Sequence, residues 1–162
     1  MEENLIKQRC CFTGHRPDKL GYTEEEIKPL LEKAIDGAIE GGYVTFISGM
    51  AKGTDIWAAE IVLEKKKKNK ALHLVCAIPH PGFINGRSAQ ERRRYENIIK
   101  NADKCVLVSD RCLPGCYQKR NIWMVDRSSG VIAVFNGTKG GTANTINYAK
   151  RHGLKIVNVL ER

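Results

Sequence analysis

The chain has 162 residues, of which 42% are apolar and 28% charged. This length suits one domain with an ordinary hydrophobic core, and the composition excludes a disordered chain. No apolar run approaches the ~20 residues that cross a bilayer, and the first residues lack a signal-peptide core. We therefore expect one domain over residues 1–162, in the cytoplasm and without a membrane span.

The formal net charge of +9 has two interpretations. Much of it lies in KKKKNK, residues 65–70, and in ERRRYE, residues 91–96. Cations at the end of a helix complement its dipole, so a solvated helix end is the simpler interpretation. A surface for nucleic acid is the alternative. It is not favoured, because the aromatic residues are few and scattered.

Short apolar runs alternate with helical patterns along the chain. The predicted strands are 9–13, 43–48, 71–78, 104–109, 130–135 and 155–159. Helices are expected after capping boxes at Thr23–Glu26 and Ser88–Glu91, and over 54–67, 118–126 and 142–152. Strands that are apolar on both faces are typical of a covered parallel sheet. The sequence therefore predicts a Rossmann-like, doubly wound α/β fold with a mainly parallel sheet and helices on both faces.

Six cysteines raise the question of disulfides or metal. Four lie in predicted strands, where free cysteine behaves as a small apolar residue: Cys10, Cys11, Cys76 and Cys105. Cys112 and Cys116, in CLPGC, have a spacing that zinc sites use, but a four-ligand site normally needs a second pair. We expect structural thiols and no metal site, with metal or redox chemistry at this pair as the alternative.

The first predicted strand ends unusually, in CCFTGHRP at residues 10–17. Ligands of doubly wound folds bind beyond the carboxyl ends of the strands. Gly14 can adopt a positive φ or let a ligand approach the backbone, and Arg16 can hold phosphate oxygens with two hydrogen bonds. His15 could donate a hydrogen bond, act as an acid or base, or be merely structural. This turn is predicted to form one wall of an anion site.

A second turn lies in SGMAKGTDIWAAE at residues 48–60. It contains Ser48, Gly49, Lys52 and Gly53 and leads into a helix that begins with Thr54 and Asp55. The N–H groups at such a helix start bind anions, although this is not a Walker A sequence. Asp55 could complement the helix dipole or accept a ribose hydroxyl. A glycine turn that only caps the helix is the alternative.

The third turn lies in FNGTKGGTANT at residues 135–145. Gly137, Gly140 and Gly141 precede Thr142, which we expect to be the N-cap of the last helix. One glycine turn is weak evidence, but three at matching strand ends predict a common site for a phosphate-bearing ligand.

Four segments together resemble the YpsA-like branch of the SLOG superfamily: CCFTGHRP, SGMAKGTDIWAAE, KRNIWMVDRSSGVIAVFNGTKGGT and NYAKRHGLKIV. The resemblance implies a pocket for a nucleotide-derived ligand such as ADP-ribose or NAD, with no required cofactor. It carries over to Gly14, Arg16, Ser48, Gly49, Gly53, Thr54, Asp55, Gly140, Gly141 and Thr142. RNIWMVD adds Arg120, Asn121 and Asp126, which either line the pocket or fix a short helix.

Relatives in this superfamily imply two further functions. DprA binds single-stranded DNA, and the LOG phosphoribohydrolases release cytokinin bases from nucleotides. LOG enzymes carry a catalytic glutamate in a PGGxGTxxE loop, and Thr145 stands at that position here. Without the carboxylate, N-glycosidic hydrolysis is the less favoured alternative, with His15, Asp55 and Glu60 as its candidate groups. We expect a binding or sensing module for a nucleotide-like molecule, with a homodimer as an open alternative.

Overall fold

The computed structural model describes residues 2–161, and the side chains of residues 4–161. The strands are β1 (Arg9–Gly14), β2 (Thr45–Ser48), β3 (His73–Ile78), β4 (Lys104–Leu107), β5 (Gly130–Val134) and β6 (Lys155–Asn158). The helices are α1 (Glu2–Lys7), α2 (Pro17–Leu20), α3 (Glu24–Glu40), α4 (Thr54–Lys66), α5 (Ala89–Asn101), α6 (Cys116–Asp126) and α7 (Gly141–Arg151). None of the helices in this described range combines the length and the apolar character that a membrane crossing requires.

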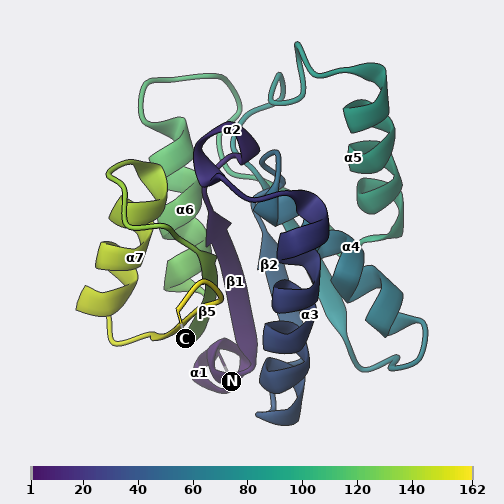
Figure 1. Ribbon diagram of the computed structural model, residues 1–162, viewed down its shortest axis with the longest axis vertical. Helices are drawn as coiled ribbons and strands as arrows, with labels where there is room; N and C mark the ends of the chain where they lie inside the picture. The colour runs from purple at the N-terminus through teal and green to yellow at the C-terminus, as the bar shows by residue number, and fades with distance from the viewer. Residues whose placement is uncertain (1, 162) are drawn as a thin grey trace.

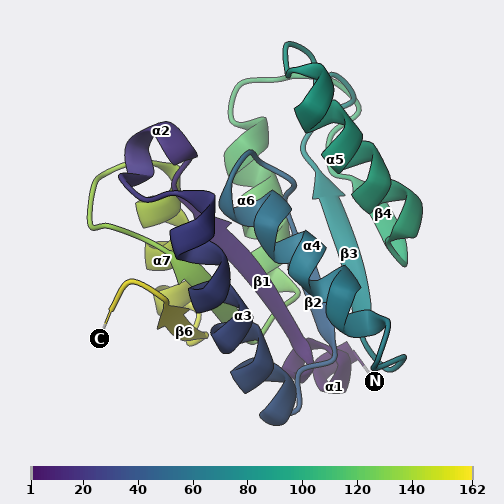
Figure 2. The ribbon, with the colours of Figure 1, turned by 45° about the vertical axis from the view of Figure 1, so that its right-hand side comes forward.

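The strands form one sheet in the order β4-β3-β2-β1-β5-β6, and every neighbouring pair is parallel. The chain winds outward from β1 to β4, then returns to the other side of β1 to form β5 and β6 (Figure 2). The predicted doubly wound fold is therefore confirmed. Its direction of winding reverses between β1 and β5, which is the point where open α/β sheets bind ligands.

Helices cover both faces of the sheet (Figure 1), as the apolar strands predicted. On one face, Phe12 and Phe46 lie in a core with side chains of α3, α4 and α5. On the other face, Cys11 and Ile47 pack with α6 and α7. The side-chain period of two sends successive strand residues into these different cores.

The edge strands are more exposed than the sequence indicated. Cys105 in β4 is exposed, so the expectation of a buried structural thiol is wrong at this position. Val157 in β6 is 41% exposed. An edge strand has a neighbour on one side only, which leaves part of its surface to solvent. The cysteines of the inner strands, Cys10, Cys11 and Cys76, are buried as expected.

Capping explains where two of the helices begin. At α3, the Glu26 N–H donates to the Thr23 hydroxyl at 3.2 Å, and the Thr23 N–H donates to the Glu26 carboxylate at 3.0 Å, which confirms the capping box. At α5, the Glu91 N–H donates to the Ser88 hydroxyl at 3.2 Å. The Glu91 carboxylate lies 3.4 Å from the Lys52 ammonium, which ties α5 to the turn before α4.

Candidate functional site

The first and second glycine turns are in direct contact. A Cβ atom built on Gly14 would lie 2.2 Å from the Thr54 hydroxyl, so the end of β1 passes directly against the start of α4. A Cβ atom on Gly53 would lie 2.8 Å from Cδ of Pro17, which begins α2. Both glycines are therefore needed for close packing between the two turns, which lie far apart in the sequence.

The third turn lies against the first. The His15 N–H donates to the Val134 carbonyl at 3.2 Å, and the His15 and Phe135 rings stack with their centroids 5.3 Å apart. The Asn136 side-chain amide donates to the Lys19 carbonyl at 3.0 Å. The three turns consequently form one rim at the carboxyl ends of β1, β2 and β5, near α2 in Figure 1.

Two helices begin at this rim without a side-chain cap. Gly53 is the N-cap of α4, with φ of 88°, and Gly140 is the N-cap of α7, with φ of 143°. The expectation that Thr142 is the cap is wrong, because it lies within the first turn of α7 and is buried. Gly137 and Gly141 are exposed at the same turn. The first N–H groups of a helix have no intrahelical partner, and the dipole makes this end positive, so both helix starts suit an anion.

Two buried polar atoms at the junction of the turns lack a hydrogen-bond partner among the described residues. These atoms are Nε2 of His15 and Oγ1 of Thr54. His15 is 5% exposed and Thr54 is 1% exposed, so bulk water does not satisfy them. Burial, and then the nearby Lys19 ammonium, lower the pKa of His15, which favours the neutral imidazole. Buried polar groups are usually paired, so each of these two atoms can still form a hydrogen bond with a ligand or with water.

The other polar groups of the second turn form hydrogen bonds within the protein. The Ser48 hydroxyl accepts from the Met50 N–H at 3.1 Å and donates to the Asp55 carbonyl at 2.9 Å. The Asp55 carboxylate accepts from the Ala51 N–H at 3.2 Å. Met50 has a φ of 63°, a conformation that is costly for a residue other than glycine. Ser48 and Asp55 therefore hold a strained turn in shape, which sequence patterns gave no means to detect.

The candidate site residues of the segment RNIWMVD, Arg120, Asn121 and Asp126, do not all lie near the rim. Arg120 is 4% exposed, and its guanidinium donates to the carbonyl of Gly49 and to the side chain of Asn121. It packs against the second turn and fills the space beside Gly49. Asp126 ends α6, about 15 Å along the helix from its start, and accepts from the Tyr148 hydroxyl at 2.6 Å. The structure does not bring Asp126 to the rim.

Two basic side chains of the predicted site reach solvent. Arg16 is exposed directly after the first turn. The Lys52 side chain is 48% exposed beside Gly53 and forms the ion pair with Glu91. Lys52 lies beside the uncapped start of α4, and together the two cations make the rim favourable for a negatively charged ligand.

Asp55 gives a stability prediction. Burial raises its pKa from the usual 3.8 to about 6, although the Arg120 guanidinium lowers it. From about pH 4 to about pH 6, the folded chain keeps a proton that the unfolded chain releases, so this group makes the free energy of unfolding fall as pH rises. We expect Asp55→Asn to flatten that fall in urea unfolding measured across this range. Parallel pH curves for the variant and the parent protein would contradict the assignment.

Most of the groups considered for the role of the LOG glutamate lie away from the rim or are engaged within the protein. The Thr145 hydroxyl is buried and donates to the Gly141 carbonyl one turn earlier in α7, at 2.9 Å. Glu60 lies within α4, where it pairs with Arg94 of α5 and Lys28 of α3. Of the three candidate carboxylates Asp55, Glu60 and Asp126, the buried Asp55 alone lies at the rim.

A cavity of about 340 Å³ adjoins the second turn. It lies beside Gly53, has apolar walls from Ile56 and Trp57, and has Arg87 and Arg94 at its border. A larger groove of about 1380 Å³ runs between α3 and α4, away from the strand ends. Its Lys65 ammonium already pairs with Asp36 at 3.0 Å, and its volume comes from a wide opening between the helices. The smaller cavity is the one connected to the rim.

The all-parallel sheet and the glycine turns at its reversal point define a Rossmann-like α/β domain. The chain belongs to the YspA SLOG family, whose YpsA model matches residues 10–158. This match confirms the resemblance found in the sequence motifs. The SPbeta prophage-derived protein YoqJ of Bacillus subtilis (strain 168) is 33% identical over 118 residues, which cover 65% of this chain and 69% of YoqJ. A UPF0398 protein of Bacillus pumilus (strain SAFR-032) is 26% identical, and the match covers 80% of this chain and 74% of the length of that protein.

Solved structures share the fold. DNA processing protein A (DprA) from Streptococcus pneumoniae has a TM-score of 0.65 at 19% identity; the match covers 94% of this chain but only 50% of DprA. DprA from Helicobacter pylori, solved to explain its single-stranded DNA binding, has a TM-score of 0.66 at 18% identity, with 96% and 66% covered. TM1055 has a TM-score of 0.57 at 14% identity, with 92% and 72% covered.

Proposed function

We propose that this protein binds a nucleotide-derived ligand of the ADP-ribose or NAD type through a phosphate group at the rim, and acts as a binding or sensing module. The observation that carries the proposal is the meeting of two uncapped helix starts with two buried, unpartnered polar atoms. Each helix start supplies N–H donors and the positive end of a helix dipole, and each of the two side chains supplies a further hydrogen-bonding group. Phosphate oxygens accept hydrogen bonds from donors of this kind.

The chemistry of the rim supports this class of ligand. The N–H groups that begin α4 and α7 supply donors from two sides, and the hydroxyl of Thr54 and the imidazole of His15 supply two more. The cavity beside Gly53 has room for part of a nucleoside, within the usual size range of ligand pockets. Its apolar walls suit a base or ribose ring, and Arg87 suits a second phosphate, whereas Arg94 is already bound by Glu24 and Glu60.

Ligand binding is expected to raise the melting temperature. A ligand at 100 times its Kd adds about 2.7 kcal/mol of stability, and each kcal/mol shifts Tm by about 2–4 °C in a chain of this size. We therefore expect ADP-ribose or NAD at millimolar concentration to raise Tm by about 5–10 °C, whereas ribose without phosphate leaves it unchanged. If none of the phosphate-bearing compounds changes the melting curve, that result contradicts the proposal.

Incubation of the same mixtures separates binding from hydrolysis. We expect the nucleotides to stay intact, because Thr145 and Glu60 are engaged elsewhere. Release of free base, seen by chromatography, would instead establish the hydrolase alternative.

Single-stranded DNA is the second candidate ligand. The formal charge of +9 and the fold shared with the DNA-binding DprA of Helicobacter pylori favour it. Binding to phosphates alone weakens steeply as salt rises, because counterions are released. Titration of a labelled oligonucleotide at low and high salt decides this, and absence of binding at low salt removes the candidate.

A further inference from the structure

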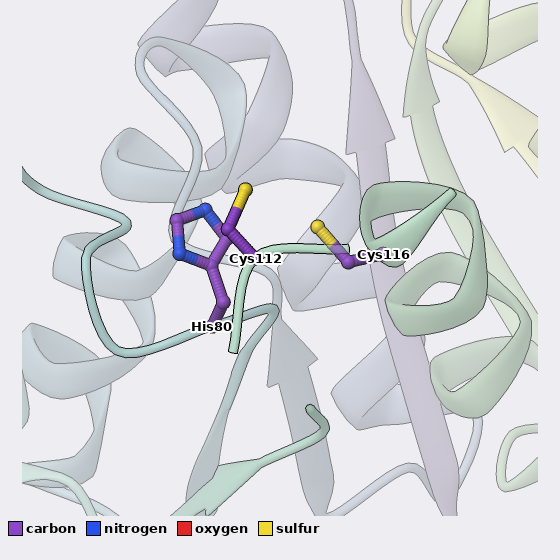
Figure 3. A group of neighbouring side chains, drawn as sticks. All are labelled: His80, Cys112 and Cys116. Atoms are coloured by element: carbon purple, nitrogen blue, oxygen red, sulfur yellow. The ribbon is translucent and has the colours of Figure 1, made fainter. Parts of the chain in front are cut away.

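A cluster of sulfur and nitrogen ligands lies outside the anion-binding rim. His80, Cys112 and Cys116 place one ligand atom each within 4.8 Å of the others (Figure 3). His80 and Cys116 are buried, and Cys112 is exposed. The sequence indicated the cysteine pair but not the third residue, which is 32 positions before Cys112.

Backbone hydrogen bonds bring these residues together. The Ser109 N–H donates to the Pro79 carbonyl at 3.1 Å, so the segments that leave β3 and β4 run side by side and carry His80 and Cys112 to the same place. Between the cysteines, Gly115 has a φ of 80°, and the Cys116 N–H donates to the Leu113 carbonyl at 3.1 Å. This tight turn places both sulfurs on the side of His80 (Figure 3).

The His80 ring is held in position by aromatic neighbours. Its Nε2 lies 3.3 Å from the Tyr117 hydroxyl, and the ring meets Tyr117 and Phe83 edge-on, at centroid distances of 5.7 and 6.2 Å. A metal-bound histidine commonly has its ring fixed by a neighbouring hydrogen-bond partner. The orientation of His80 is therefore set by the fold.

We propose that His80, Cys112 and Cys116 bind one Zn²⁺ ion with a fourth position left for water or a solute. Two thiolates and an imidazole are ligands that zinc prefers, and three protein ligands are typical of open zinc sites. Bonds of about 2.3 Å to sulfur and about 2.0 Å to nitrogen require ligand atoms about 3.5–4 Å apart, and the exposed Cys112 side chain moves to close the remaining gap. Binding releases one proton from each thiol, so the ion and two thiolates together carry no net charge.

The test uses reduced, chelator-treated full-length protein, with Zn²⁺ measured by mass spectrometry and Co²⁺ by visible absorption. We expect one ion per chain and the spectrum of a tetrahedral thiolate site. Cys112→Ser and His80→Gln are expected to lose that spectrum, and Tyr117→Phe to weaken binding about 10–100-fold. Cys105→Ser is the matched control, because it removes an exposed cysteine outside the cluster and should keep the ion.

Two results would overturn the proposal. One is a reduced protein that takes up neither metal. The other is a Cys112→Ser variant that keeps the Co²⁺ spectrum, because the Cys112 side chain is exposed and its replacement should leave the protein folded. Circular dichroism of each variant checks that the fold is intact.

Discussion

Gly141→Glu is expected to abolish phosphate-ligand binding without lowering stability. Gly141 begins α7, and a Cβ atom on it would meet no other atom within 4 Å, so the side chain fits. Its carboxylate would lie where the ligand's negative charge is proposed to lie. Like charges a few ångströms apart near a protein surface repel by about 3 kcal/mol, which weakens Kd more than 100-fold. Isothermal titration with ADP-ribose, or with whichever phosphate compound raises Tm, measures the change.

The same substitution should stabilise the free protein. A carboxylate in the first turn of a helix complements the dipole by about 0.3–1 kcal/mol, so Tm should stay equal or rise slightly. Gly141→Gln is the matched control, with the same size and no charge, and should keep most of the affinity. If Gly141→Glu binds as tightly as Gly141→Gln, the phosphate does not lie at the start of α7.

Gly14→Ala is expected to destabilise the protein more than any other glycine-to-alanine substitution discussed here. The new Cβ atom would lie 2.2 Å from Oγ1 and 2.6 Å from Cβ of Thr54, so β1 and the start of α4 must move apart. Overpacking of this kind costs about 1–3 kcal/mol, which lowers Tm by about 2–12 °C. Urea unfolding and thermal melting measure the loss. Binding should weaken as well, because Thr54 is displaced from the rim.

Gly37→Ala is the matched control with the opposite sign. Gly37 lies inside α3, and a Cβ atom there would meet nothing within 4 Å. Replacing a helix-interior glycine by alanine should raise stability by about 0.5–1 kcal/mol. In a Thr54→Ala background, the cost of Gly14→Ala should fall, because part of the obstructing side chain is gone. An unchanged cost in that background would contradict the contact between the first two turns.

The sequence predicted the architecture because its signals are local. Each strand is a short apolar run followed by a helical pattern, and alternation of this kind has one common solution. The short α2 was missed although Pro17 begins it and Gly21, with φ of 77°, ends it, which are ordinary helix limits. The position of Cys105 in an exposed edge strand depends on strand order, which no single segment records.

The candidate site was predicted in outline but not in its working details. Glycines at three strand ends indicated the rim, because parallel strands bring those ends to one edge of the sheet. The orphaned imidazole of His15 and the strained backbone of Met50 depend on neighbours that come from distant segments. The same holds for His80 beside Cys112, since the pairing of β3 with β4 creates that contact.

Amide chemical-shift mapping by NMR tests the central claim most directly. During titration with ADP-ribose, or with whichever phosphate compound raises Tm, we expect Gly53 and Thr54 to shift together with Gly140 and Gly141, and the His15 ring to shift at the same ligand concentration. One saturating process seen from all three turns would mean that they hold a single phosphate group. Shifts confined to one turn, or found in the groove between α3 and α4 instead, would contradict a shared site.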